Sequence, residues 1–447
     1  MKFGGTSVAD APAINRFIGI VKTRLENKPV VVVSALSQVT NILTEICSRA
    51  ANGEYSSVVD LIEKLRSRHI GLCEELFGTD KTRLNEAARE IENLLSSLRE
   101  MTKAISFLCE ISDRRQAEII GMGELLSNIV VHNALNNSGV RCNKVYAREF
   151  IITDNNYLKG KADQNSINLK TPAVIEKAFA GHQIVLTQGF ISTAKDGFPS
   201  LLGREGSDLT ATLIGMALNA EMIEIWTDVD GIHTTDPRKV TNTKSITQMS
   251  FEVAEELSFF GAKVRHPLTI QPARSRNIPV RVLNSRNPDN PGTLILDAGT
   301  VSEKGIKSVT CKENITLLNI VSDKSLSTHD FLNSVFRIFN KYRVLIDLIS
   351  ISESGIAVAV ESFTDIENIT EELEHFSKTN IHFDKSQVSV VGEELRETKG
   401  IMKKIFSCMD NFSVDMISAG GSDINVSFVV SRHDLSNVMQ TLHDELF

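Results

Sequence analysis

Short runs of β-branched residues recur along the first two thirds of the chain, separated by helical patterns. The clearest run lies within Lys28–Ser37, and similar runs occur at Gln183–Leu186, Met222–Trp226 and Val280–Leu283. Continuous apolar runs of this length are typical of strands that are buried on both faces of a parallel sheet. Their alternation with helices predicts an α/β fold, with a mainly parallel sheet sandwiched by helices.

A long helical region interrupts this alternation. From about residue 55 to 131 the apolar residues recur at helical spacing, as in Val58–Ile62 and Ile91–Leu95. We therefore expect a helical insertion between two strands of the sheet. The chain has 447 residues, which is too long for one core and favours about three domains.

The carboxyl-terminal region contains an internal repeat, which follows a turn-rich stretch at 287–293. Ile346–Ser350 and Val414–Ser418 both read aliphatic-Asp-x-Ile-Ser, and each is followed by a strand-like run. Strand-like segments at Ile315–Val321 and Gln387–Val391 precede the two helices of the repeat. The order strand–helix–strand–strand–helix predicts two small ferredoxin-like α+β modules. A ligand pocket between them and a duplicated spacer without a ligand are both open interpretations.

These patterns predict three domains. Residues 1–297 form an α/β domain with the insertion at about 55–131, residues 298–385 form the first module, and residues 386–447 form the second.

Composition narrows the class of protein. An apolar content of 42% with 23% charged residues is that of a globular protein, and the net charge of −8 argues against nucleic acid or an acidic membrane as partner. The six cysteines are scattered, which favours buried free thiols in a reducing compartment. Without a membrane-length apolar run or a signal peptide, we expect a cytoplasmic protein.

The amino terminus has the composition of a phosphate-binding turn. Lys2 is followed by Gly4, Gly5, Thr6 and Ser7, just ahead of a helical pattern. Glycines let the backbone approach an anion, the helix directs free N–H groups at it, and lysine adds a mobile charge. The spacing matches neither a Walker A loop nor a dinucleotide fingerprint, and an ordinary surface turn is the alternative.

Two further clusters combine glycines with charged residues. In the segment 203–208, Arg204 can bind a carboxylate through two hydrogen bonds, whereas Ser207 and Asp208 also suit a helix N-cap. The segment 226–238 directly follows a buried strand, where the ligand crevice of an open α/β sheet lies. Thr227 and Asp228 are thus placed for a nucleotide. The alternative is a polar loop rich in turn residues. No metal-ligand spacing is visible, so we expect any Mg²⁺ to arrive with a nucleotide.

Taken together, the motifs resemble those of aspartokinases, which are members of the amino-acid kinase family. The resemblance covers nearly the whole chain, and the repeat resembles the paired ACT modules of that family. It rests on segments 2–7, 33–35, 40–41, 123–124, 188–190, 203–204, 226–229, 235–238 and 260–263.

The resemblance implies transfer of the γ-phosphoryl group of MgATP to the side-chain carboxylate of L-aspartate, giving 4-phospho-L-aspartate. This reaction is the entry to the lysine, threonine and methionine branch of amino-acid biosynthesis. Such a transfer needs two aligned anions and neutralised charge rather than covalent help from the protein. A monofunctional enzyme is implied, without a homoserine dehydrogenase domain. A homodimer through the ACT modules is also implied, and a tetramer is the alternative.

The resemblance also assigns roles to single residues. Lys2 and Lys263 would hold the phosphates together with the N–H groups of Gly4–Ser7, and Asp208 would position Lys2. Arg204 would bind the aspartate α-carboxylate and Glu124 its ammonium. The remaining substrate-binding residues would be Ser34, Thr40 and Ser207, and the remaining nucleotide-binding residues would be Thr227, Asp228, His233 and Arg238.

The sequence departs from the family pattern at four positions. Lys2 stands almost at the amino terminus, where the family usually has a short strand before it. Glu205 replaces a small residue, often Gly, and puts a negative charge beside Arg204. His233 replaces a common Tyr, and Asp230 replaces a common Pro.

The chain resembles the lysine-sensitive members most closely, which implies free lysine as the feedback inhibitor. Ser325 and Ser327 match those members less well. Another amino-acid kinase, and a non-catalytic ACT-type amino-acid sensor, are the alternative functions. The implied effector residues are Thr328, Phe331, Leu332, Ile346, Asp347, Ser352 and Glu353.

Overall fold

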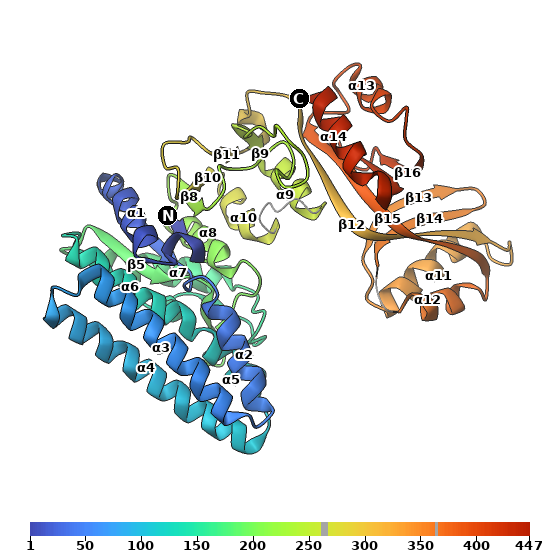
Figure 1. Cartoon of the computed structure of the whole chain (residues 1–447). Helices are drawn as coiled ribbons and strands as arrows, with labels where there is room; N and C mark the ends of the chain where they lie inside the picture. Colours follow the sequence, from blue (N-terminus) through green and yellow to red (C-terminus); the bar gives the residue numbers. More distant parts are fainter. Residues whose placement is uncertain (261–266, 363–364) are drawn as a thin grey trace. The chain divides into compact units, whose positions relative to one another are not determined.

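The computed structural model describes residues 1–260, 267–362 and 365–447 (Figure 1). The chain divides into two units. Unit 1 contains Met1–Ile232 and Arg265–Asp297, and unit 2 contains His233–Val264 and Ala298–Phe447. The predicted domain boundary at 297/298 thus falls between units, whereas residues 233–264 group with the carboxyl-terminal half. The domain boundaries stay a prediction.

Unit 1 is built on the predicted parallel sheet. Its strands follow the order β3-β5-β2-β1-β8-β10-β11, and all neighbours pair in parallel except β10 and β11. All four β-branched runs are strands of this sheet, as predicted. The bounds are β1 Lys2–Phe3, β2 Val30–Val33, β3 Cys142–Lys144, β5 Ile184–Gln188, β8 Ile223–Thr227, β10 Val280–Asn284 and β11 Thr293–Leu296.

Helices cover this sheet. Unit 1 also contains a small second sheet with the strand order β4-β6-β7. The small strands are β4 Ile152–Thr153, β6 Ile191–Ala194 and β7 Pro199–Leu201. The helices are α1 Ala11–Lys22, α2 Val39–Ala51, α3 Tyr55–Phe77, α4 Lys81–Leu108, α5 Asp113–Ile120, α6 Met122–Asn137, α7 Gln164–Ala178, α8 Gly206–Leu218 and α10 Pro267–Arg274, with short 3₁₀ turns η1 Gly5–Val8, η2 Leu25–Asn27 and η3 Ala147–Glu149.

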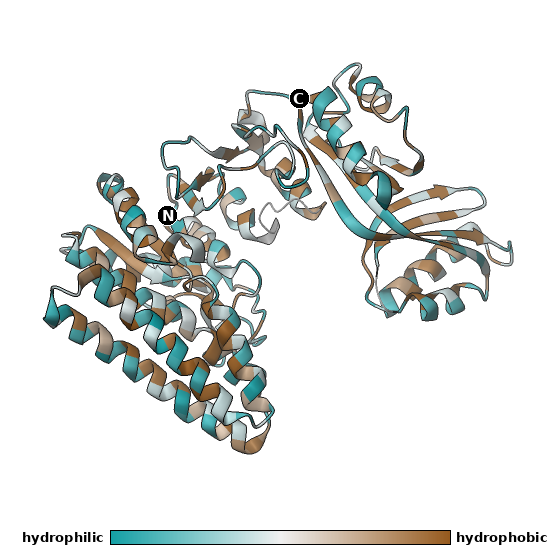
Figure 2. Cartoon of the chain, viewed as in Figure 1, coloured by the Kyte–Doolittle hydropathy of each residue, from teal (hydrophilic) through white to brown (hydrophobic). Residues whose placement is uncertain are grey.

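The predicted helical insertion is present between β2 and β3. Helices α3 and α4 lie side by side, with buried residues every third or fourth position (Figures 1 and 2). In α4 the side chain of Asp80 caps the helix by accepting a hydrogen bond from the Arg83 N–H at 3.0 Å. His69 of α3 lies in this core, where burial lowers its pKa to about 4 and keeps it neutral. The insertion continues into α6, which ends at Asn137 rather than near 131.

Unit 2 contains a six-stranded sheet of order β13-β14-β12-β15-β17-β16, with helices α11 to α14 on one face. The repeat is confirmed, because β13 and β14 correspond to β16 and β17 in order and pairing. Its strands are β12 Gly305–Ser322, β13 Ile346–Ser352, β14 Gly355–Glu361, β15 Ser377–Glu393, β16 Val414–Ala419 and β17 Asn425–Ser431. The other elements of unit 2 are β9 Gln248–Ser250, α9 Phe251–Phe259, α11 Thr328–Lys341, α12 Ile366–Leu373, α13 Ile401–Ser407, α14 Leu435–Leu446, η4 Ala298–Thr300 and η5 Arg432–Asp434.

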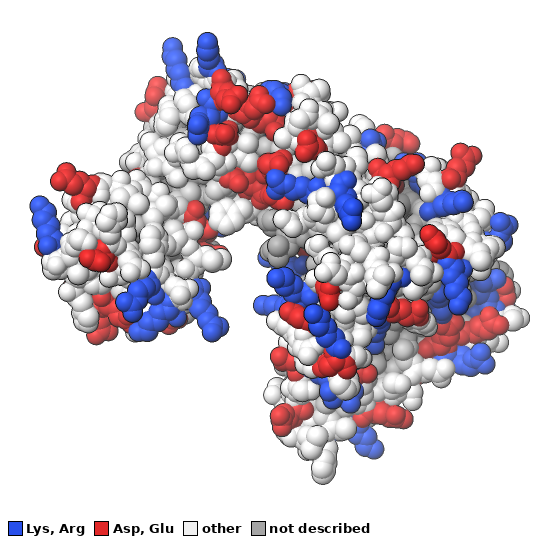
Figure 3. Space-filling view, turned by 180° about the vertical axis from the view of Figure 1, so that it is seen from behind, with Lys and Arg blue, Asp and Glu red and all other residues white. Residues whose placement is uncertain are grey.

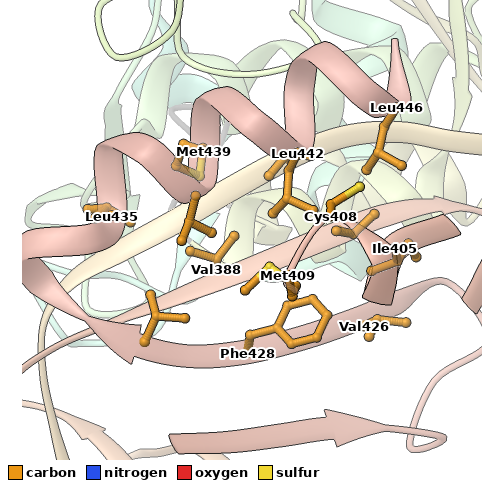
Figure 4. Close-up of a cluster of buried hydrophobic side chains, with 14 of the residues drawn as sticks. Val388, Ile405, Cys408, Met409, Val426, Phe428, Leu435, Met439, Leu442 and Leu446 are labelled. Atoms are coloured by element: carbon orange, nitrogen blue, oxygen red, sulfur yellow. The ribbon is translucent and has the colours of Figure 1, made fainter. Parts of the chain in front are cut away.

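The two modules share their central strands. Strands β12 and β15 are antiparallel along their whole length, so the first part of β12, residues 305–312, pairs with residues 387–393. The first part of β12 therefore completes the sheet of the second module, although its residues fall within the range predicted for the first module. Val309 of β12 accordingly lies in the core of the second module, with Phe428 and Leu442 (Figure 4 labels the last two among other members of this core).

The structure shows how the charged side chains are distributed on the surface and how far the cysteines are exposed. Acidic and basic side chains are interspersed over the face drawn in Figure 3. Four cysteines are buried free thiols, but Cys109 is exposed and Cys311 is half-buried, so the expectation of buried thiols was wrong for Cys109. Within the described residues, no helix is both long and apolar enough to cross a membrane.

Candidate active site

Lys2 lies at the centre of the unit 1 sheet, because β1 is flanked by β2 and β8 in parallel register. Its Nζ atom is 2.6 Å from Oδ1 of Asp208, and both side chains are less than a tenth exposed. Asp208 stands in the first turn of α8, where the positive end of the helix dipole favours a carboxylate. The pairing of Lys2 with Asp208, predicted from the family resemblance, is therefore present in the structure.

The glycine turn after Lys2 packs tightly against the end of β2. A Cβ atom on Gly5 would lie 2.7 Å from the Ala35 carbonyl oxygen, so a side chain is excluded there. The Gly5 carbonyl accepts a hydrogen bond from the Ser37 N–H at 3.1 Å. The turn η1 that follows buries Ser7 and leaves Thr6 exposed. This close backbone approach is the geometry that a phosphate-binding turn requires.

Three strand ends meet beside this turn. The hydroxyl oxygens of Ser7 and Ser285 are 2.8 Å apart, and the Ser285 hydroxyl donates to the Thr227 carbonyl at 3.0 Å. Thr227 ends β8, and Ser285 directly follows β10. The carboxyl ends of parallel strands are where ligands bind in open α/β sheets. Ser285 was not predicted from the sequence, and only its place after a buried strand could have indicated it.

Glu124 is a buried carboxyl group near Lys2. It stands in the first turn of α6 and is 3% exposed. Its Oε1 accepts a hydrogen bond from the Ala35 N–H at 3.2 Å, whereas Oε2 has no hydrogen-bond partner among the described residues. Burial raises the pKa of Glu124 to about 8, although Lys2 acts in the opposite direction. An unpartnered buried carboxylate oxygen is suited to receive a cationic ligand group.

The backbone is strained at two residues that lie near Gly206. Phe190 and Glu205 have φ values of 68° and 54°, in the left-handed region that disfavours side chains. The Phe190 ring packs where a side chain on Gly206 would stand, since a Cβ there would be 2.7 Å from Phe190 Cδ2. Backbone strain of this kind concentrates at functional sites. The preference for Gly at position 205 thus has a backbone reason, and Phe190, which belongs to the family motif at 188–190, was assigned no role from the sequence.

The predicted substrate residues of unit 1 lie in loops and in the first turns of helices. Arg204 is exposed, Ser207 is buried at the start of α8, and Ser34 directly follows β2. Ser34 is held beside β1 because its N–H donates to the Phe3 carbonyl at 3.2 Å. Thr40 is half-buried in the first turn of α2. Arg204 is accessible to a dissolved ligand, whereas Glu124 is buried.

The loop after β8 is fixed to β10. The Asp230 carboxylate accepts a hydrogen bond from the Asn284 side-chain amide at 2.7 Å. This contact gives the departure at Asp230 a local role, because the carboxylate ties the loop to the neighbouring strand. In the same loop, the Thr227 hydroxyl donates to the Asp228 carboxylate at 3.3 Å.

Two of the remaining predicted nucleotide residues group with the carboxyl-terminal half of the chain. His233 and Arg238 belong to unit 2. Arg238 is exposed, and its Nε donates to the Asp236 carboxylate at 2.9 Å. This pairing holds the pKa of Asp236 below its usual range. Lys263 lies outside the described residues. Across the described ranges, no group of three or more His, Cys, Asp or Glu side chains is placed to hold a metal ion.

The predicted effector residues are spread along the first module. Asp347 stands near the start of β13, whereas Ser352 ends that strand and Glu353 follows it. Asp347 and Ser352 are five positions apart along the strand, which is about 16 Å at roughly 3.3 Å per residue. One free amino acid cannot contact both on a single chain. Of the others, Thr328 begins α11, Phe331 is buried, Leu332 is half-buried and Ile346 begins β13.

Sequence comparisons match the chain to known proteins over its whole length. The profile of the amino acid kinase family matches residues 1–284, and that of an ACT domain matches residues 388–446. The lysine-sensitive aspartokinase 3 of Escherichia coli is 32% identical over 455 residues, which cover 100% of this chain and 98% of that protein. The chloroplastic aspartokinase 1 of Arabidopsis thaliana is 31% identical over 464 residues, covering 100% of this chain and 80% of that protein.

Solved structures show the same fold. Aspartokinase III of E. coli in complex with aspartate and ADP, described as the R-state, has a TM-score of 0.83 at 31% identity, covering 100% of this chain and 99% of that chain. The complex of that enzyme with lysine and aspartate, described as the T-state, has a TM-score of 0.81 at 31% identity, covering 100% and 98%.

Proposed function

Because the chain belongs to the amino-acid kinase family, as an aspartokinase with an ACT domain, we propose that its site transfers the γ-phosphoryl group of MgATP to the side-chain carboxylate of L-aspartate. The product is 4-phospho-L-aspartate, the first intermediate of the lysine, threonine and methionine branch. Aspartate kinases are enzymes under allosteric control. The aspartokinase III of E. coli has been solved in complex with aspartate and ADP.

One observation carries the proposal. The buried pair of Lys2 and Asp208 stands in the same site as Glu124, whose Oε2 atom is buried without a partner among the described residues. Phosphoryl transfer needs a cation at the transferred group and a fixed acceptor, and little else from the protein. Lys2 supplies the cation, and Glu124 supplies an anchor for the acceptor's ammonium.

In this proposal the substrate aspartate is bound through its α-carboxylate and its α-ammonium group. Arg204 binds the α-carboxylate through its guanidinium, and Glu124 accepts the ammonium, while Ser34, Thr40 and Ser207 complete the contacts. This leaves the side-chain carboxylate free to attack the γ-phosphorus. The charge that develops on the transferred group is stabilised by Lys2, which Asp208 holds in one orientation.

The nucleotide is bound at the strand ends beside the glycine turn. Of the N–H groups of Gly4–Ser7, those of Gly4 and Ser7 donate to the Trp226 and Gly4 carbonyls at 3.2 and 2.9 Å, so the phosphates are assigned in this proposal to those of Gly5 and Thr6. Thr227 and Asp228 contact the nucleoside side. His233, Arg238 and Lys263 are assigned to the same nucleotide on the family resemblance alone. Mg²⁺ is a part of the substrate MgATP in this proposal, and it neutralises the β- and γ-phosphates.

Free lysine is the proposed inhibitor, and a homodimer is the proposed assembly. Asp347 provides a carboxylate for an ammonium, and β13 is an edge strand of its sheet. Antiparallel pairing of β13 with its copy would place Asp347 of one chain near Ser352 and Glu353 of the other. This arrangement would let one lysine molecule contact both ends of the strand, which a single chain does not allow.

The activity is tested by aspartate-dependent hydroxamate formation with MgATP and hydroxylamine. We expect a signal with L-aspartate and none with L-glutamate. A signal with glutamate alone would identify a different amino-acid kinase, and none with any amino acid would identify a non-catalytic sensor.

Inhibition is tested with Asp347→Ala, and Asp415→Ala is the matched control from the second module. Coupling between allosteric sites is typically about 1–3 kcal/mol, so wild-type inhibition is strong but incomplete. We expect Asp347→Ala to lose inhibition by lysine relative to its own uninhibited rate, while Asp415→Ala keeps it. Inhibition by threonine instead of lysine would assign a different effector to the ACT region.

A further inference from the structure

The repeat places two ion pairs at corresponding positions of the two modules. Lys312 Nζ is 2.5 Å from Oδ1 of Asp347, and Lys385 Nζ is 2.7 Å from Oδ2 of Asp415. Both lysines come from the middle of the long shared strands, and both aspartates stand near the start of an outer strand. The two pairs therefore provide a comparison within one chain.

Each aspartate lies in an irregularity of its strand. The register of β13 against β14 shifts between Ile346 and Leu348, and that of β16 against β17 shifts between Val414 and Met416. The skipped residue is Asp347 in one strand and Asp415 in the other. A bulge of this kind re-aims a side chain and is typically retained for a purpose.

The surroundings of the two pairs differ. The Asp347 side chain is 6% exposed and that of Asp415 is 29% exposed. Lys312 Nζ also lies 4.7 Å from the centre of the Phe259 ring, at the end of α9. In the described part of the chain, no aromatic ring stands over Lys385. Burial and the cation–π contact both strengthen the hold of Lys312 on its position.

Phe259, which contacts Lys312, adjoins a second buried cluster of the sheet in unit 2. The rings of Phe259 and Phe260 meet edge to face with centres 5.0 Å apart. Phe260 is buried in a cluster with Leu348 and Met416, which belong to the two outer strands. Lys312 thus holds Asp347 on one side and touches α9 on the other.

We propose that the ammonium group of Lys312 competes with the ammonium group of the effector for the Asp347 carboxylate. This inference rests on the proposed regulation by free lysine and adds to it. The side chain of Lys312 ends in the same primary ammonium that free lysine carries, and it already occupies the carboxylate assigned to the effector. The effector binds only when Lys312 leaves Asp347, so its affinity is reduced by the fraction of chains in which the pair is open.

The second module serves as the internal reference. The pair of Lys385 and Asp415 has the same chemistry and nearly the same length, but Asp415 is more exposed and Lys385 lacks the ring contact among the described residues. Removing Lys385 therefore changes the charge of the chain by the same amount as removing Lys312. Only the removal of Lys312 frees the carboxylate at which the effector is proposed to bind.

The test is calorimetric titration of the full chain with free L-lysine, for the wild type, Lys312→Met and Lys385→Met. We expect Lys312→Met to bind lysine about tenfold more tightly than the wild type, as for a site that is open in a tenth of the molecules. We expect Lys385→Met to bind as the wild type does. Binding to Lys312→Met but not measurably to the wild type also supports the proposal.

Controls separate the proposal from loss of fold and from the proposed activity. Lys312→Arg keeps a cation on Asp347 and should retain the wild-type dissociation constant, and thermal unfolding shows whether each variant is folded. Equal or weaker binding to a folded Lys312→Met, or binding to none of the variants, overturns the proposal. Failure of the proposed activity is seen separately, as the absence of aspartate-dependent ADP formation by the same wild-type preparation.

Discussion

Each unit contains a short Lys–Asp ion pair, and the two pairs have different surroundings. Lys2 and Asp208 in unit 1 are 2.6 Å apart, and Lys312 and Asp347 in unit 2 are 2.5 Å apart. Around the first pair, Glu124 has a buried oxygen without a described partner, and the backbone is strained. Around the second pair, an aromatic ring lies near Lys312, and Asp347 stands in a bulge of an antiparallel strand.

The two pairs have nearly the same Lys–Asp distance, so this distance alone does not reveal the role of either pair. A buried ion pair contributes little net stability, because desolvation offsets the Coulomb attraction. The role follows from what is left unsatisfied nearby. In unit 1 an unsatisfied carboxyl oxygen lies nearby and supports the proposed substrate site, whereas the effector site proposed in unit 2 requires the ion pair to open first.

The largest expected effect separates the two units directly. Lys2→Ala should lower kcat by about 10²–10³-fold, because the cation stabilises charge that develops during transfer. The control is Lys385→Met, which removes an ion-paired lysine from unit 2 and should leave turnover near the wild-type value. Steady-state kinetics with saturating aspartate and MgATP measures both.

Loss of Lys2 also leaves Asp208 buried without this partner, so the fold of the variant must be checked. Thermal unfolding followed by circular dichroism serves this purpose, and Lys2→Arg retains the charge if Lys2→Ala does not fold. Near-normal turnover in a folded Lys2→Ala variant would show that Lys2 and the glycine turn after it do not form the phosphate site.

The next effect divides substrate from nucleotide within the site. Arg204→Ala should raise the KM for aspartate by about one to two decades, since a charged hydrogen bond contributes about 1.5–3 kcal/mol. The KM for ATP should change little. Arg238→Ala, an exposed arginine of unit 2, is the matched control and should act on the KM for ATP. An unchanged aspartate KM in Arg204→Ala would exclude this residue from substrate binding.

The protonation of Glu124 gives a smaller effect with a defined sign. Its pKa is raised to about 8, so below pH 8 the free enzyme carries a neutral group that cannot pair with the substrate ammonium. The kcat/KM for aspartate should therefore rise about tenfold between pH 7 and pH 9, since this ratio reports the pKa values of the free enzyme. Glu124→Gln should be less active and lack this rise. A wild-type profile that is flat over this range would contradict the assignment.

The smallest effect concerns the departure at position 205. Glu205 has a left-handed backbone conformation beside Arg204, which Gly adopts without strain. Glu205→Gly should lower the aspartate KM a few-fold, by removing a negative charge from the carboxylate site. Glu205→Gln removes the charge and keeps the strain, so it should give the same KM with a lower unfolding temperature than Glu205→Gly. A higher aspartate KM in both variants would show that Glu205 assists binding.

Much of the fold could be predicted because local patterns carried it. The β-branched runs became β2, β5, β8 and β10, and the helical spacing at 55–131 became the insertion. The repeat became two modules with matching bulges at Asp347 and Asp415. In the site, the pairing of Lys2 with Asp208 was inferred from the family resemblance, because their positions in sequence are far apart.

Other features depend on contacts between distant segments. Ser285 enters the site through a hydroxyl contact with Ser7, 278 residues away. The division of β12 between both modules follows from its pairing with β15, which no local pattern contains. The strain at Phe190 depends on its neighbours rather than on its own preference.

The sequence by itself determined which segments are strands and helices, that a module is repeated, and which family the chain resembles, because periodicity and motif spacing are properties of the chain alone. Only the tertiary structure decided that Glu124 keeps an oxygen without a described partner and that Lys312 occupies Asp347. Burial and charge pairing are set by what packs around a side chain. The pKa of a carboxyl group, and its availability to a ligand, are therefore decided only when the fold is complete.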